Sequence, residues 1–187
     1  YQEYIDAKAN IFTHQSPKDI AVFNADNADS VTQAAKAVGE VRWFSRRKRV
    51  DNGVFCENGV IYEAADGRVT PIMETKDILL PGVHNVENYM AAFAAVRGQV
   101  RYETMREIAK TFGGVEHRIE LIRTRDGVRW YNDSIASSPS RTIAGLNSFP
   151  EKVILIAGGK DKGISYAPLG PVVNDRVKLL LLCGKTA

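Results

Sequence analysis

The sequence predicts an α/β protein whose second part carries a mainly parallel sheet. Two continuous apolar runs, VILIA at 153–157 and VKLLLL at 177–182, are typical of buried parallel strands. A third run of β-favouring residues, VRWY at 128–131, leads into a polar cluster and then a helix-like segment from Pro139. Strands that alternate with helices in this way imply right-handed crossovers between parallel neighbours.

The chain opens with a pattern that fits one helix over residues 1–12. Its apolar residues recur at spacings of three and four and share a face: Tyr1, Tyr4, Ile5, Ile11 and Phe12. Lys8 falls in the middle of that face, where its charge needs water or a partner. Either the stem lies along the core while the amine reaches solvent, or this lysine has a function.

The pattern over the next segment is rich in strands. Residues 19–24 read as a buried strand, 24–27 as a polar turn and 28–38 as a short helix. Four strand-like runs follow up to Leu80: VRWF, VFCENGVIYEA, RVTPIM and ILL. Asn58-Gly59 and Asp66-Gly67 predict hairpin turns, because both dipeptides adopt positive φ readily.

Two helices are expected at 88–97 and 101–112, and Gly113-Gly114 then breaks the pattern. We place a domain boundary there, which divides the chain into residues 1–114 and 115–187. The second part begins with a strand at 119–122 and a turn at Asp126-Gly127.

The composition is that of a soluble globular protein, with 44% hydrophobic and 25% charged residues. The net charge of +3 is mild, and its densest source, Arg46 to Arg49, reads as a solvated turn beside a hairpin. We therefore expect no nucleic-acid partner. No signal peptide or membrane-length apolar run is visible, so we expect a cytoplasmic protein without a membrane partner.

Cys56 and Cys183 lie far apart in strand-like runs, which predicts buried free thiols in a reducing compartment. The chain has no initiator Met and stops just after a strand pattern. We expect it to be part of a longer protein.

Two polar loops should follow the carboxyl ends of parallel strands, at 132–138 and 158–163. Such loops line the ligand crevice of open α/β sheets. The crevice would hold Asp133, several hydroxyls, Lys162 and Arg141, a set that suits a polar, anionic small molecule. Alternatively, Ser137 or Ser138 caps the helix that starts with Pro139.

A second candidate segment is Leu80 to Asn88, LPGVHNVEN, with His84, Asn85 and Asn88 just before a helix. Either asparagine could serve only as a helix cap. Arg118 at the proposed boundary could clamp a phosphate through two hydrogen bonds, or simply be exposed. Gly184-Lys185-Thr186 lacks the earlier glycine of a phosphate loop, and we reject it as one.

Six motifs in order resemble the Mur ligases: Ala7-Lys8 in a tyrosine-rich helix, Asn24 to Asp26, Leu80 to Asn88, EHRIE at 116–120, YNDSIASSP at 131–139 and GGKDKG at 158–163. The resemblance covers essentially the whole chain. The NDS segment and GGKDKG point to the branch that adds D-glutamate.

The resemblance implies a three-domain enzyme of peptidoglycan precursor synthesis. Residues 1–114 would be the later part of a central, P-loop-type ATP-binding domain, and 115–187 the first part of a Rossmann-like C-terminal domain. ATP would phosphorylate the carboxylate of UDP-N-acetylmuramoyl-L-alanine, and D-glutamate would attack the acyl phosphate. The implied cofactors are ATP and Mg²⁺, and we expect a monomer.

The resemblance also implies roles for single residues. Lys8 matches a lysine that the family carboxylates, and a carbamate oxygen suits magnesium. Nucleotide-binding positions are matched by Asn85, Asn88, Arg118 and Asp133. Lys162 matches the lysine that meets the D-glutamate carboxylate, and Ser137 and Ser138 lie at neighbouring substrate positions.

One departure from the family pattern concerns the amino-acid pocket. Many relatives have lysine after NDS, but this chain has Ile135, and Ser138 replaces a common asparagine. We hypothesise that Arg141, one helical turn further, supplies the missing charge. A sister Mur or folylpolyglutamate-type ligase remains an alternative, as does a noncatalytic nucleotide-binding module, because fold alone would allow it.

Overall fold

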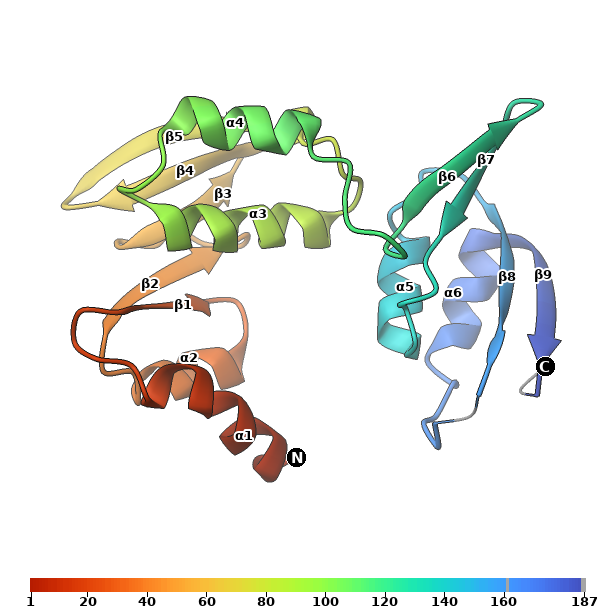
Figure 1. Ribbon diagram of the computed structural model, residues 1–187, viewed down its shortest axis with the longest axis horizontal. Helices are drawn as coiled ribbons and strands as arrows, with labels where there is room; N and C mark the ends of the chain where they lie inside the picture. The colour runs from red at the N-terminus through yellow and green to blue at the C-terminus, as the bar shows by residue number, and fades with distance from the viewer. Residues whose placement is uncertain (161, 186–187) are drawn as a thin grey trace. The chain divides into compact units, whose positions relative to one another are not determined.

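The computed structural model describes residues 1–160 and 162–185. The chain forms two compact units, one comprising residues 1–79 and 85–112, the other residues 80–84 and 113–187. Together they contain six α-helices and nine strands within the described ranges, in the order drawn in Figure 1. None of the helices in those ranges is both long and apolar enough to cross a membrane.

The first unit is built on a five-stranded sheet of order β1-β2-β3-β4-β5. β1 (Ile20–Asn24), β2 (Glu40–Ser45) and β3 (Gly53–Glu57) are parallel neighbours, and β4 (Val60–Ala65) and β5 (Arg68–Glu74) continue the sheet antiparallel. Both predicted hairpin turns are confirmed. Asn58 and Asp66 have φ of 50° and 51°, each followed by a glycine at positive φ, as this turn type requires.

The basic run connects two parallel strands, and its last residue, Arg49, pairs with Glu57 beside the β3–β4 hairpin turn. Residues 46–52 return the chain from β2 to β3, with Trp43 opposite Gly53. Gly53 has φ 145°, and a Cβ there would lie 1.9 Å from the Trp43 carbonyl oxygen. Only glycine permits both the conformation and this close approach.

The first unit contains the helices α1 (Gln2–Thr13), α2 (Ala28–Ala34) and α4 (Tyr102–Thr111), and α3 (Val83–Val96) from Asn85 onward. A short 3-10 turn, η1 (Thr75–Asp77), follows β5, and the predicted strand ILL at 78–80 is not formed. α2 ends earlier than predicted. α3 and α4 lie side by side along the sheet in Figure 1.

The core of this unit lies between the sheet and α3 and α4. Its most deeply buried side chains are Val54, Phe55, Ile61 and Met90. A second cluster joins α1 to the edge of the sheet, where Phe12 packs edge-on against Phe23 with ring centroids 5.1 Å apart. The prediction of a buried apolar face on α1 was wrong for Tyr1, Tyr4 and Ile11, which are 86%, 63% and 73% exposed.

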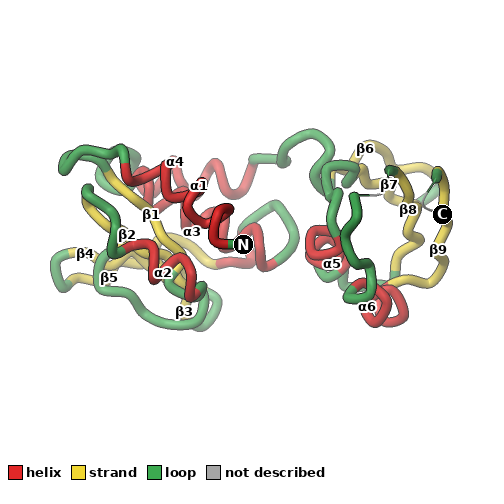
Figure 2. The backbone as a smooth tube through the Cα atoms, turned by 90° about the horizontal axis from the view of Figure 1, so that it is seen from below, coloured by secondary structure: helices red, strands yellow, loops and turns green. Residues whose placement is uncertain are grey.

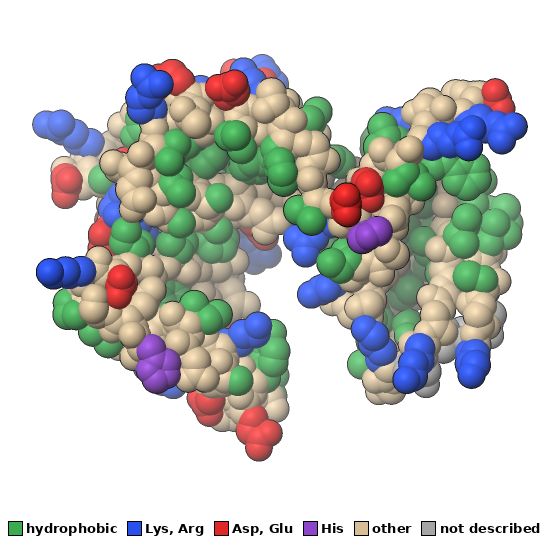
Figure 3. All heavy atoms as spheres, in the orientation of Figure 1, with side chains coloured by type: hydrophobic (Ala, Val, Ile, Leu, Met, Phe, Trp, Pro, Cys, Tyr) green, Lys and Arg blue, Asp and Glu red, His purple; other side chains and the backbone are tan. Residues whose placement is uncertain are grey.

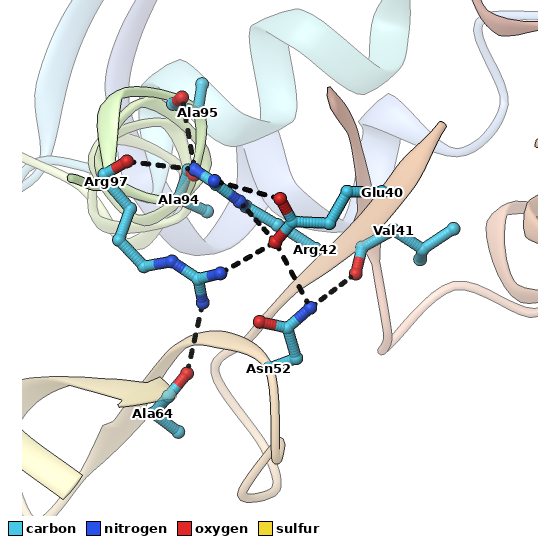
Figure 4. A network of polar contacts seen from close by, with 8 residues as sticks. All are labelled: Glu40, Val41, Arg42, Asn52, Ala64, Ala94, Ala95 and Arg97. Carbon is cyan, nitrogen blue, oxygen red and sulfur yellow. Dashed lines mark hydrogen bonds and ion pairs between the residues drawn. The ribbon is translucent and has the colours of Figure 1, made fainter. Parts of the chain in front are cut away.

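A buried arginine fastens α3 to the sheet (Figure 4). Arg42 on β2 donates from Nη1 to the Ala94 and Arg97 carbonyls at 2.9 and 3.1 Å, at the end of α3. Its Nε and Nη2 bind both oxygens of Glu40, at 2.9 and 3.1 Å. Arg97 also donates to Glu40, at 2.8 Å, so one carboxylate joins β2 to the segment that follows α3.

The second unit contains two pairs of strands. β6 (Glu120–Arg125) and β7 (Val128–Asn132) form an antiparallel hairpin, and β8 (Val153–Gly159) and β9 (Val177–Gly184) are parallel. The parallel pair was predicted correctly. However, within the described residues β7 pairs with β6 and not with β8, so the three strands do not share one sheet.

Two helices cover one face of the parallel pair. α5 (Pro139–Leu146) and α6 (Leu169–Arg176) lie on the same side of β8 and β9 in Figures 1 and 2. Apolar side chains of the strands are exposed, among them Ile156 at 57% and Leu182 at 55%, and Figure 3 shows hydrophobic side chains gathered over these strands. Cys183 is exposed and Cys56 half-buried, so the prediction of two buried thiols was wrong.

Candidate functional site

The loop that follows β7 is organised by its own polar side chains. Asn132 Oδ1 accepts from the Ser134 amide at 3.1 Å, and the Asp133 carbonyl accepts from the Ala136 amide at 2.9 Å. These bonds close a tight turn between the end of the strand and the start of α5. The loop therefore presents Asp133 in a defined direction.

Asp133 lies half-buried between the EHRIE segment and α5. Its Oδ1 accepts a hydrogen bond from the Ile119 amide at 3.1 Å. A Cβ on Gly145 of α5 would lie 2.8 Å from Oδ2, so the carboxylate occupies space that another residue would fill. Burial raises the pKa of the Asp133 carboxyl above its ordinary value, while the Ile119 bond and the charges of His84 and Arg118 oppose that rise.

The two residues that flank Arg118 have left-handed backbone conformations. His117 has φ 66° and Ile119 has φ 46°. Such values are unusual for residues other than glycine, and a β-branched side chain makes them more costly. Strained backbone of this kind often marks a functional loop. The exposed Arg118 therefore stands at the tip of a fixed turn.

The start of α5 differs from the predicted helix cap. Ser138 is the N-cap residue and Pro139 the first helical residue, but the Ser138 side chain makes no capping bond. Its hydroxyl lies 3.2 Å from that of Ser140, and Ser137 is exposed. The Ser138 hydroxyl is therefore not used as a helix cap. The Arg141 Nη1 donates to the Ile135 carbonyl at 3.3 Å, so its guanidinium lies beside residue 135.

The predicted nucleotide residues of the LPGVHNVEN segment lie inside a helix, not in front of one. α3 begins at Val83, directly after Pro81-Gly82, five residues earlier than expected. Asn85 is buried, and its Oδ1 accepts from Asn88 Nδ2 at 3.3 Å. His84 belongs to the second unit, where its charge influences Asp133.

The two predicted catalytic lysines are both exposed. Tyr4 and Ile11 beside Lys8 on α1 are exposed as well, whereas Phe12 on the same face is buried. The Lys8 Nζ lies 5.6 Å from the centre of the Tyr4 ring. Lys162 lies in the loop after β8. The motif GGKDKG includes Asp161, which lies outside the described residues.

The structure therefore brings together Asp133, Arg118 and His84 in the second unit, while Lys8, Asn85 and Asn88 belong to the first. A cavity of about 410 Å³ lies elsewhere, at the β4–β5 hairpin, and none of the predicted residues lines it. Among the described residues, no three acidic, histidine or cysteine side chains gather to hold a metal ion.

Sequence reasoning missed Ile119 and Gly145 as parts of this site. A glycine inside a helix costs stability and is a usable signal of close packing. The left-handed conformation of Ile119 has no such signal, because isoleucine rarely adopts it.

Comparison with known proteins identifies the family. Residues 1–96 match the model of the Mur ligase middle domain. The chain belongs to the Mur ligase family. This confirms the family proposed from the motifs at the N-terminal helix and the LPGVHNVEN segment.

Sequence relatives extend the match beyond the middle domain. The chain is 53% identical over 186 residues to a UDP-N-acetylmuramoylalanine--D-glutamate ligase of Ruminiclostridium cellulolyticum, and 52% identical to that of Acetivibrio thermocellus. In both cases all of this chain is covered, and it spans 40% of the relative's length.

Solved structures of other Mur-type ligases share the fold. A UDP-N-acetylmuramoylalanyl-D-glutamyl-2,6-diaminopimelate--D-alanyl-D-alanyl ligase from Acinetobacter baumannii matches 97% of this chain and 42% of its own, with TM-score 0.73 and 16% identity. A pseudomurein peptide ligase type C from Methanothermus fervidus matches 97% of this chain and 44% of its own, with TM-score 0.65 and 15% identity. These likenesses establish a Mur ligase fold.

Proposed function

We propose that this chain is part of an ATP-dependent ligase that adds D-glutamate to UDP-N-acetylmuramoyl-L-alanine. The observation that carries the proposal is the identity of about half of all residues, over the whole chain, with ligases named for that reaction. The first unit would be the later part of a P-loop-type central domain, and the second the first part of a Rossmann-like C-terminal domain. A cytoplasmic monomer fits this role.

The proposed reaction phosphorylates the substrate carboxylate and then lets the amine of D-glutamate displace phosphate. Negative charge on the phosphoryl oxygens must be stabilised by placed cationic groups. The guanidinium of Arg118 suits phosphate oxygens because it donates in a fixed fork. Asp133 can accept from a ribose hydroxyl, and the amides of Asn85 and Asn88 can serve the nucleotide base.

Lys8 is the residue proposed to carry a carbamate. Its amine is exposed and so accessible to CO₂. As a carbamate it would offer Mg²⁺ one oxygen ligand, whereas a protonated amine offers none. Magnesium, when bound, neutralises phosphoryl charge. The described residues contain no three-residue metal cluster, so Lys8 is the single ligand that we assign.

The D-glutamate pocket would be formed by Lys162, Ser137, Ser138 and Arg141. The hydrogen bond from Arg141 to the Ile135 carbonyl supports this arrangement, because it holds a cation beside residue 135. Arg141 thereby compensates for the absent lysine.

Replacing Arg141 with alanine in the complete protein should raise the KM for D-glutamate about tenfold and leave the KM for ATP unchanged, because a charged hydrogen bond to the substrate carboxylate is lost. Steady-state kinetics with each substrate varied would measure both constants. Arg125→Ala is the control, since Arg125 is an exposed cation paired with Asp126 at the hairpin tip. An unchanged KM for D-glutamate would remove Arg141 from the pocket.

The proposed function is tested by phosphate release from the complete protein with ATP, Mg²⁺ and UDP-N-acetylmuramoyl-L-alanine. Release should depend on D-glutamate and not on L-glutamate, L-lysine or meso-diaminopimelate. Dependence on another amino acid would favour a sister ligase. If no phosphate is released with any of these amino acids, the noncatalytic nucleotide-binding module is favoured.

A further inference from the structure

We propose that Asp133 is a positioning residue that holds the turn at residues 117–119 in its left-handed conformation and so aims Arg118. That Arg118 binds a phosphate rests on the proposed function, whereas the positioning of Arg118 by Asp133 does not.

The turn would not keep its shape unaided. Two residues other than glycine lie in the left-handed region within three positions, one of them β-branched, and each costs free energy in this conformation. Surrounding groups must supply that energy. The structure shows which groups contact the turn.

Each of the two strained residues donates its amide to a carboxylate. The His117 amide binds Glu120 Oε2 at 2.8 Å, and the Ile119 amide binds Asp133 Oδ1 at 3.1 Å. Hydrogen bonds to charged acceptors are stronger than those between neutral groups. Glu120 is local to the turn, whereas Asp133 comes from the far side of the β6–β7 hairpin.

The strand register explains why Asp133 reaches Ile119. Glu120 lies opposite Asn132, which makes residues 119 and 133 the next position along the ladder. There the side-chain carboxylate of Asp133 accepts the Ile119 amide. The His117 ring also contacts Asn132, with Nδ1 and Nδ2 2.8 Å apart. The loop after β7 therefore serves as a template for the turn.

The carboxylate itself has little freedom to move. Its second oxygen lies where a Cβ on Gly145 would come within 2.8 Å, and the backbone of its loop is fixed by the bonds of Asn132 and Ala136. A rigid acceptor holds its donor better than a mobile one, because less entropy is lost when the bond forms.

Asp133→Asn and Asp133→Ala separate positioning from charge. Asparagine keeps an oxygen that can accept from the Ile119 amide, whereas alanine removes the acceptor. Amide hydrogen exchange of Ile119, measured by NMR on this chain, should accelerate about tenfold in Asp133→Ala and change little in Asp133→Asn. Asp126→Ala, at the exposed tip of the same hairpin, is the matched control and should have no effect.

Exchange of the Leu155 amide on β8 is read in the same spectra to detect general unfolding of the unit. Faster exchange at Ile119 with unchanged exchange at Leu155 supports the inference. Exchange at Ile119 that is equal in Asp133→Ala and the unaltered chain overturns it. Equal acceleration at both amides also overturns it, because Asp133 would then stabilise the whole unit.

In the complete protein, Asp133→Ala should raise the KM for ATP about fivefold, and this increase should be smaller in an Arg118→Ala background, since coupled residues are not additive. Additive increases would overturn the functional part of the inference. If the unaltered protein releases no phosphate while Ile119 responds as expected, the proposed function fails and the positioning stands.

Discussion

Replacing Arg42 with alanine should destabilise the chain by about 3 kcal/mol. Arg42 is 7% exposed. Its removal leaves the Ala94 and Arg97 carbonyls at the end of α3 without their donor. It also takes from Glu40 the cation that binds both of its oxygens. Urea unfolding followed by circular dichroism would measure the change.

Arg49→Ala is the matched control, because Arg49 binds both oxygens of Glu57 in the same way but on the surface. Exposed ion pairs contribute about 0–1 kcal/mol. Equal losses from the two variants would show that burial and the helix carbonyls add nothing at Arg42.

The Arg42 contact should also make stability depend on pH. The hydrogen bond from Arg42 lowers the pKa of the Glu40 carboxyl below its ordinary value, against an opposing effect of burial. The stability that the Arg42–Glu40 contact contributes is therefore complete above the pKa of Glu40 in the unfolded chain. It is lost as pH falls through the pKa of Glu40 in the folded chain. The Arg42→Ala variant should lose less stability on acidification than the unaltered chain.

Replacing Lys8 with arginine should lower kcat of the complete protein about 100-fold or more, if Lys8 carries the proposed carbamate. Arginine preserves a long stem and a positive charge but stays protonated, so it cannot react with CO₂. A lysine that only packs its stem against α1 would tolerate the change. The measurement is phosphate release under saturating substrates.

A second measurement detects the carbamate on Lys8 directly. With ¹³C-labelled bicarbonate, a carbamate carbon signal should appear in the NMR spectrum of the complete protein and be absent from Lys8→Arg. Lys18→Arg is the control, since Lys18 is another exposed lysine near α1. Full activity of Lys8→Arg would contradict the role assigned to Lys8.

Much of the local structure could be predicted from residue types. Asn58-Gly59, Asp66-Gly67 and Asp126-Gly127 all form the predicted hairpin turns, because a preference for positive φ belongs to the residues themselves. The runs at 153–157 and 177–182 form neighbouring parallel strands. The start of α3 was misplaced although Pro81-Gly82, directly before it, is a readable break.

The sequence by itself determined the turns, most strands, the helix that starts at Pro139 and the motifs of the Mur ligases. Only the tertiary structure decided that Tyr4 and Cys183 are exposed, that β7 pairs with β6, and that Asp133 holds the Ile119 amide. The reason is physical: turn and strand preferences act between neighbouring residues, whereas burial and side-chain contacts depend on which distant segments pack together. The left-handed Ile119 is the clearest case, since its own preferences oppose a conformation that its surroundings impose.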